Sequence, residues 1–160
     1  MSTPPRVTPP IGTPGFLLDT SVISALAPGR ERHLSANLAD WLLAHDARLC
    51  IPCIAVAELA QGIDKLRRTG GVERAQRLDL WLDRLVAGYG DRILSLDPFA
   101  ARLAGKLSDA AAAKGRHPGF ADVAIAAIAL HNGHLLLTRN LKHFEPLGVA
   151  CADPFLKLPA

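Results

Sequence analysis

The sequence predicts an α/β fold in which a parallel sheet of four to five strands is flanked by helices on both faces. Short runs that are apolar throughout alternate with longer stretches of helical periodicity along the chain. Strands that are buried on both faces show this pattern, and their alternation with helices is typical of parallel sheets. The length of 160 residues fits one domain with its own hydrophobic core.

In the first half of the chain, apolar patterns and their boundaries predict each element. Gly15–Asp19 is a short apolar run that ends in an acid, as expected of a buried strand. Pro52 marks the end of the second strand, because proline cannot donate a hydrogen bond to a central ladder. The expected elements are strands at 15–19 and 48–53, with helices at 20–26, 31–46, 55–68 and 72–87.

The second half repeats this alternation. Asp97 supplies an N-cap before Pro98 at the first helical position, which opens an Ala/Leu-rich helix. Phe120–His131 is apolar on nearly all sides, so it predicts a buried helix, and Gly133 is its stop. Strands at 92–96 and 134–138, helices at about 98–114 and 120–131, and a marginal fifth strand around Val149 complete the expected fold.

The bulk properties restrict the class of protein. Residues 1–14 hold five prolines without an apolar signal-peptide core, so we expect a flexible leader followed by one domain over 15–160. No run approaches the roughly 20 apolar residues that a membrane span needs. Three cysteines suit a reducing cytoplasm better than a disulfide framework. The net charge of +3 permits a nucleic-acid partner without requiring one.

Polar side chains follow the expected strands at the edge where open parallel sheets form their sites. Asp19 ends the first strand, Glu58 lies about one turn into the helix after the second, and Asn140 follows the fourth. Asp122 lies near the start of the buried helix, although acids are rarely buried unless they are paired or bound to a metal. Taken alone, an acid after a strand is more often a helix cap than a metal ligand, and Asp122 stands apart only because of its apolar surroundings. Together, their oxygens would select a hard cation, Mg²⁺ or Mn²⁺.

Four blocks that contain these residues resemble, in order, the signature blocks of PIN domains, above all those of the bacterial VapC and FitB-like toxins. They are Phe-Leu-Leu-Asp-Thr-Ser-Val-Ile-Ser (16–24), Val-Ala-Glu-Leu-Ala-Gln-Gly-Ile (56–63), Ala-Asp-Val-Ala-Ile-Ala-Ala-Ile-Ala (121–129) and Leu-Leu-Thr-Arg-Asn-Leu-Lys-His-Phe (136–144). The resemblance covers about residues 15–149. It implies a PIN-like fold, an Mg²⁺- or Mn²⁺-dependent endoribonuclease that cleaves RNA, a homodimer, and a VapB-like antitoxin as partner in a type II toxin–antitoxin system.

The resemblance also implies roles for individual residues. Asp19, Glu58 and Asp122 match the first three conserved acids of the family. Asp19 and Asp122 would be direct metal ligands, while Glu58 would bind metal or orient the attacking water. Asn140 stands where many members have a fourth Asp, and it would assist. His143 replaces a second Asp, so both departures remove negative charge from the pocket.

Further residues complete the expected pocket. Ser21 and Thr138 are plausible supporting groups, because hydroxyls after the first acid often help in such sites. Arg116, Arg139 and Lys142 flank the pocket and are expected to contact RNA phosphates.

Other motifs indicate different chemistry less well. Cys50-Ile-Pro-Cys53 matches the C-x-x-C pattern of redox and zinc sites, but odd spacing on a strand places the two side chains on opposite faces. We interpret both cysteines as core residues. His131 and His134 straddle a helix stop, and Asp97 is most simply an N-cap.

A basic surface leaves two interpretations open. Three arginines and a tryptophan share one face of the helix expected at 72–87, and three more basic residues end the preceding helix. A solvated face is the simpler interpretation, and a docking surface for RNA or an antitoxin is the other. The residues are Arg74, Arg77, Trp81 and Arg84, preceded by Lys65, Arg67 and Arg68.

Two other functions compete with the nuclease. A non-catalytic PIN-like module would bind RNA or protein without cutting, and Asn140 is its best support. A phosphoacceptor signalling domain also has acids after a parallel strand, but it needs paired acids after the first strand and a lysine after a late one. The chain has neither adjacent acids nor that lysine, since Arg139 and Asn140 follow the fourth strand.

Overall fold

The computed structural model describes residues 14–160 and contains a parallel sheet with the strand order β3-β2-β1-β4-β5. The predicted α/β class is therefore confirmed. The expected leader lies outside the described residues, apart from Pro14. The strands are β1 (Phe16–Leu18), β2 (Leu49–Pro52), β3 (Ile93–Leu94), β4 (Leu135–Leu137) and β5 (Cys151–Ala152).

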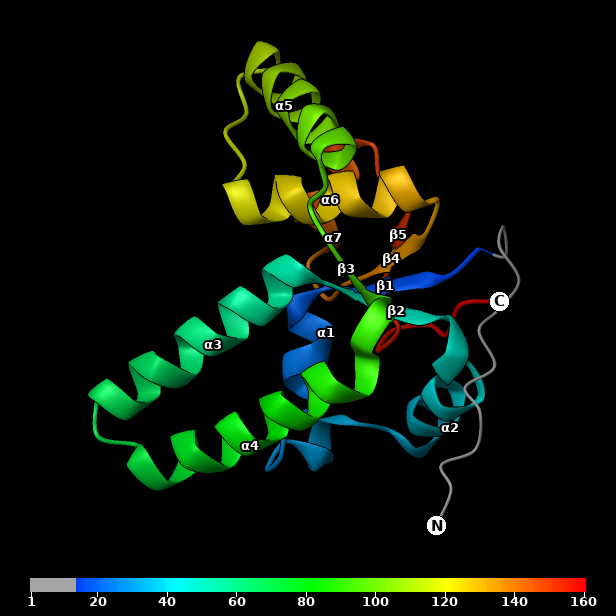
Figure 1. The fold of residues 1–160 in the computed structure, drawn as a ribbon. Coiled ribbons are helices and arrows are strands. Elements are labelled where there is room, and N and C mark those ends of the chain that lie inside the picture. Colours follow the sequence, from blue (N-terminus) through cyan, green and yellow to red (C-terminus); the bar gives the residue numbers. More distant parts are fainter. Residues whose placement is uncertain (1–13) are drawn as a thin grey trace.

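Helices cover both faces of the sheet (Figure 1). Figure 1 shows α5, α6 and α7 on one face, and α1, α2 and the long pair α3 and α4 on the other. The pair projects beyond the edge of the sheet and is held together by its own apolar contacts around Ile63, Ala75 and Leu82. The helices are α1 (Thr20–Ala25), α2 (Ala36–Ala44), α3 (Cys53–Arg68), α4 (Val72–Tyr89), α5 (Pro98–Ala113), α6 (Phe120–Asn132) and α7 (Leu141–Phe144).

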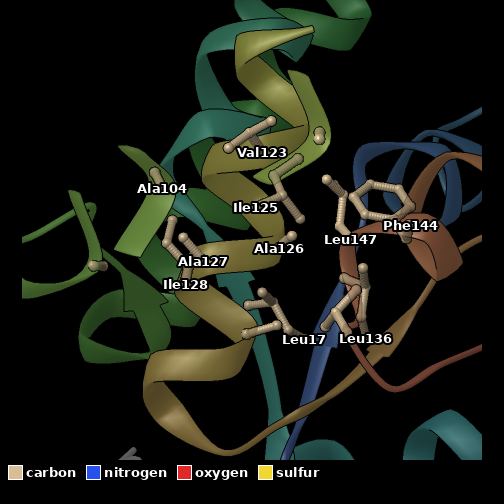
Figure 2. Close-up of a cluster of buried hydrophobic side chains, with 14 residues drawn as sticks. Leu17, Ala104, Val123, Ile125, Ala126, Ala127, Ile128, Leu136, Phe144 and Leu147 are labelled. Carbon is tan, nitrogen blue, oxygen red and sulfur yellow. The ribbon is translucent and has the colours of Figure 1, made fainter. Parts of the chain in front are cut away.

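Alternating side chains of the central strand β1 divide the core into two layers. Leu17 packs in the layer that contains α5 and α6, whereas Phe16 and Leu18 pack in the layer that contains α1 and α2. This is the period of two expected of a strand buried on both faces. Figure 2 shows Leu17 and Leu136 facing the α6 side chains, with Phe144 beside them.

The buried helix predicted at 120–131 forms as α6, and residues 123–129 are all buried. It ends at Gly133, whose φ of 65° is the left-handed conformation that glycine adopts without strain. The predicted cap of α5 is also confirmed, because the Asp97 side chain accepts a hydrogen bond from the Ala100 N–H at 2.8 Å. Among residues 14–160, no helix combines the length and apolar character that crossing a bilayer requires.

Several boundaries differ from those predicted. The helix expected at 31–46 is divided, because the Ser35 side chain accepts from the Leu38 N–H at 3.2 Å and starts α2 there. Residues 31–33 form a separate 3₁₀ turn. Cys53 opens α3 rather than ending β2. The fifth strand lies at 151–152, since Ala150 provides the carbonyl that pairs with Leu136. The short α7 and the 3₁₀ turn at 145–147 were not predicted.

Gly15 lets β1 lie close to its neighbours just before the strand begins. Its N–H donates to Nδ1 of His134 at 3.1 Å, and its carbonyl accepts from the Leu135 N–H at 3.1 Å. A Cβ at this position would lie 2.9 Å from the Arg48 carbonyl oxygen and 3.0 Å from Cε1 of His134. The packing therefore requires a residue without a side chain.

We expect Gly15→Ala to destabilise the protein by about 1–3 kcal/mol, because backbone and ring must move apart to admit the methyl group. Urea unfolding measures the change. Gly105→Ala on α5 is the control, since nothing lies within 4 Å of its added Cβ. It should be neutral or stabilise the protein by up to about 1 kcal/mol. Equal stability of the two variants would contradict the close packing at Gly15.

Candidate functional site

Asp19 lies where the central strands β1 and β4 end. Its N–H donates to the Leu137 carbonyl at 2.9 Å, and its own carbonyl accepts from the N–H groups of Val22 at 2.9 Å and Ile23 at 3.1 Å. The residue is therefore fixed between the sheet and the first turn of α1. From β1 the chain continues to β2 and β3 on one side, whereas β4 and β5 lie on the other side of β1. The gap between the ends of β1 and β4 is therefore the switch point at which open sheets form sites.

Two hydroxyl groups hold the Asp19 side chain, which is only 4% exposed. Oδ2 accepts from Ser21 Oγ at 2.7 Å and from Thr138 Oγ1 at 2.8 Å. In residues 14–160 no group donates to Oδ1, so within this part of the chain one oxygen of the carboxylate is available to a ligand.

The two hydroxyls are themselves oriented by the backbone after β4. The Arg139 N–H donates to Ser21 Oγ at 3.0 Å, and the Asn140 N–H donates to Thr138 Oγ1 at 3.0 Å. Each hydroxyl accepts a hydrogen bond from a backbone N–H and donates a hydrogen bond to Asp19. Such a chain polarises and strengthens both of its bonds. The structure thus places Ser21 and Thr138 against the first acid.

Glu58 lies on α3, beside the residue that follows Asp19. Its Oε1 accepts a hydrogen bond from Thr20 Oγ1 at 2.7 Å, which links α3 to the start of α1. This contact between two helices was not predicted from the sequence. Glu58 also lines a hollow between α1, α3 and α4, which we call the Trp81 hollow and which includes Thr20, Arg74 and Trp81.

Asp122 lies in the first turn of α6 and is half-buried. Its Oδ2 is 3.2 Å from His143 Nδ1 on α7. Burial raises the pKa of Asp122 above its usual value, the negative charge of Asp19 raises it further, and the contact with His143 opposes both effects. Asp19 and Asp122 are thus close enough to repel each other.

The remaining predicted residues are distributed unevenly. Asn140 is exposed at the start of α7, and its side chain forms no capping hydrogen bond. Arg116 and Lys142 line a hollow of about 450 Å³ together with Asp122 and His143, which we call the Asp122 hollow. The side chain of Arg139 is not part of this hollow, and its guanidinium lies 4.7 Å from the centre of the Phe155 ring.

These residues suit a hard cation that keeps much of its water. Within residues 14–160, no three His, Cys, Asp or Glu side chains lie together in a ready-made metal site. Asp19 nevertheless offers an open oxygen, and a cation would relieve its repulsion with Asp122. Mg²⁺ is usually bound by one or two carboxylates and several waters. Glu58 could also bind the cation if its carboxylate gave up the hydrogen bond from Thr20.

The competing motifs have structural roles. The prediction that both cysteines belong to the core holds only in part: half-buried Cys50 lies in β2 and packs against the core, whereas half-buried Cys53 opens α3 and joins no core cluster among the described residues, and both are free thiols. His131 lies 3.4 Å from Asp97, the cap of α5. His134 accepts the Gly15 N–H.

The basic residues of α3 and α4 are divided between two roles. Arg67 pairs with Asp64 and Asp79, so its charge is used within the helix pair. Arg74 lines the Trp81 hollow with Trp81 itself. Lys65 and Arg68 line a hollow along α3 together with Glu58.

Known proteins resemble the chain over most of its length. The family model described as "PIN domain" matches residues 16–146. The chain is 36% identical over 141 residues to plasmid stability protein StbB of Pseudomonas syringae pv. tomato, covering 88% of this chain and 98% of that protein. It is similar in structure to FitAcB from Neisseria gonorrhoeae, with a TM-score of 0.69 and 28% identity over 88% of this chain and 98% of that chain. DNA-bound VapBC from Salmonella typhimurium gives a TM-score of 0.67 and 26% identity with the same coverage.

We expect Asp122→Asn to raise the melting temperature of the metal-free protein at pH 7. A raised pKa means that the folded state binds the proton more tightly than the unfolded chain, so ionisation costs stability as the pH rises through the folded pKa. Asparagine removes this cost, and the gain should shrink as the pH falls towards about 4. Differential scanning calorimetry in EDTA measures it, with the exposed Asp109→Asn as control. A lower melting temperature at pH 7 would mean that the His143 contact outweighs burial.

Proposed function

The chain belongs to the PIN-domain family, and from this premise we propose that it is the toxin of a toxin–antitoxin pair, a Mg²⁺- or Mn²⁺-dependent endoribonuclease. The observation that carries the proposal is the Asp19 carboxylate, which is held through Oδ2 by two hydroxyls while Oδ1 stays open beside Asp122. A rigid carboxylate with one available oxygen is suited to binding a cation. A second acid within range of its charge supports the same use.

The residues divide the work as follows. Asp19 and Asp122 would bind the ion directly, and Ser21 and Thr138 would hold Asp19 in its orientation. When bound, such an ion lowers the pKa of a coordinated water and polarises a phosphodiester. Glu58 would bind the ion or accept a hydrogen bond from the attacking water, since its second carboxylate oxygen is not engaged by Thr20. Asn140 would assist, because its exposed amide forms no capping bond.

The toxin role is supported by the relatives and by the position of the Trp81 hollow. The similar proteins are named as a plasmid stability protein and as FitAcB and VapBC complexes. The Trp81 hollow combines a large aromatic ring, Arg74 and Arg30 with Glu58 at its wall. A VapB-like antitoxin segment seated there would cover Glu58 and so could silence the site. Trp and Arg are the residue types that dominate binding energy at interfaces.

We extend the proposal to a homodimer in the cytoplasm. Phe99 on α5 is 72% exposed and stacks with its ring centre 6.1 Å from that of His131, which leaves apolar surface for a second copy to cover. The cysteines at 50, 53 and 151 are all free thiols, the state that a reducing compartment maintains.

The alternative is a PIN-like module that binds RNA or protein without cutting. Two observations favour it: Asn140 replaces an acid, and residues 14–160 contain no preformed cluster of three metal-ligating side chains. Cleavage that requires Mn²⁺ and is suppressed by EDTA would separate the nuclease from this module.

We expect Asp19→Asn and Asp122→Asn each to abolish RNA cleavage and growth inhibition and to weaken Mn²⁺ binding at least about tenfold. Each change removes a charged oxygen ligand. Calorimetric titration with Mn²⁺ and gel assays of RNA cleavage measure the effects, and circular dichroism checks that the fold is intact. Asp109→Asn, an exposed acid on α5, is the matched control. Full cleavage by either site variant would refute this site.

We expect the protein encoded by a small open reading frame next to this gene to relieve growth inhibition and to co-purify with the chain. Arg74→Glu should weaken that complex at least about tenfold, because it reverses a charge inside the Trp81 hollow. Arg77→Glu is the control one turn further along α4, outside the hollow. If no neighbouring product restores growth, the antitoxin part of the proposal fails.

A further inference from the structure

We propose that the Asp122 hollow binds a phosphodiester next to the one that is cut, so that the substrate is gripped by protein cations beside the metal site. This inference rests on the proposed nuclease function and adds a second point of contact for its substrate. The hollow adjoins the metal site directly, because Asp122 belongs to both. Its volume of about 450 Å³ lies within the range of pockets that hold small ligands, on the order of 300–1,000 Å³.

The charge of the Asp122 hollow favours an anion. Arg116 and Lys142 are permanent cations, and Asp122 is the single carboxylate, so two positive charges face one negative charge. His117 and His143 add two further hydrogen-bonding rings. In residues 14–160 neither Arg116 nor Lys142 forms an ion pair with a carboxylate. Their charges are therefore available to a phosphate.

A second hollow, which Glu58 lines, lacks this excess. It lies along α3, and its lining contains the acids Glu58 and Asp64 against the cations Lys65 and Arg68. Two positive charges there meet two negative charges, so no net attraction for a phosphate remains. Of these two hollows, only the Asp122 hollow, beside α7 and the loop before α6, carries an excess of positive charge. The Trp81 hollow also has two cations, Arg30 and Arg74, against Glu58, but the proposed function assigns that hollow to the antitoxin.

The backbone fixes Arg116 at the edge of the Asp122 hollow. Helix α5 ends in a Schellman motif, in which the Arg116 N–H donates to the Ala111 carbonyl at 2.9 Å and the Gly115 N–H donates to the Ala112 carbonyl at 2.9 Å. Gly115 has a φ of 73°, the left-handed conformation that this motif requires. The turn therefore places Arg116 in a set position rather than on a free loop.

The opposite wall is also fixed. Lys142 and His143 lie on α7, whose first turn is closed by a hydrogen bond of 2.9 Å from the His143 N–H to the Asn140 carbonyl. Phe144 follows them and is fully buried, which anchors the helix to the core. The buried Leu147 and Ala111 form an apolar floor on which a ribose or base can lie. A nucleotide is divided in the same way, with an anionic phosphate to face the cations and a sugar and base to face the apolar floor.

The test compares Arg116→Gln/Lys142→Gln with the control Arg102→Gln/Lys106→Gln. Both double variants lose two positive charges, and Arg102 and Lys106 are exposed on α5 outside the hollow. Binding of a fluorescein-labelled oligoribonucleotide is measured by anisotropy without cleavage, in Ca²⁺ or EDTA. We expect the hollow variant to bind at least about tenfold more weakly than the control at low salt. The slope of log K against log salt should also fall by about 1.4, or about 0.7 for each lost phosphate contact.

Cleavage then separates this inference from the proposed function. We expect the hollow variant to lose RNA cleavage mainly through a higher KM and to retain its Mn²⁺ affinity. Its hydrolysis of bis(p-nitrophenyl) phosphate, a diester with no neighbouring phosphate, should fall much less than its cleavage of RNA. Equal RNA binding by the two double variants would overturn the inference while leaving the nuclease intact. Loss of antitoxin binding with RNA affinity unchanged would overturn it too. Absence of any metal-dependent cleavage by the unmodified protein would instead refute the proposed function.

Discussion

The site depends on the hydrogen bonds that Ser21 and Thr138 donate to one oxygen of Asp19. They join the end of β1 to the end of β4, the two central strands whose connections diverge. Because both donors engage Oδ2, the carboxylate is held in one orientation and no described residue donates to its other oxygen. The position of the first acid is therefore set by the sheet rather than by a mobile loop.

The fold could be predicted from the sequence wherever a long apolar pattern, or a residue typical of a helix end, defined an element. Helix α6 is an example, since its apolar run and Gly133 stop are both local signals. The break at Ser35 was missed because helical spacing continued across it, and only the side-chain bond to Leu38 shows the start of α2. The short α7 was missed because four residues carry too little periodicity, and its stability comes from the buried Phe144.

At the site, the sequence indicated which residues follow the strands but not what their side chains contact. The bond from Thr20 to Glu58 and the contact of His143 with Asp122 join elements that are distant along the chain. Such pairs depend on side-chain rotamers and on helix packing, neither of which leaves a periodic signal. Arg139 illustrates the same limit. Its position next to Asn140 in the sequence suggested a phosphate contact, but its guanidinium lies over the Phe155 ring.

In the proposed nuclease, the departures from the family pattern would shift part of the binding from acids to cations. Asn140 and His143 stand where negatively charged side chains are common in the resemblance, so the pocket would hold a metal ion with less negative charge of its own. His143 also contacts Asp122 and lowers its pKa, which offsets part of the cost of burying that carboxylate. The same residue lines the Asp122 hollow with Arg116 and Lys142. One substitution thus reduces repulsion among the acids and adds a hydrogen-bonding group on the side where a polyanion would lie. If the chain is the proposed nuclease, the cations beside this site would attract the phosphate in their own right and so compensate for a weaker attraction of the metal ion.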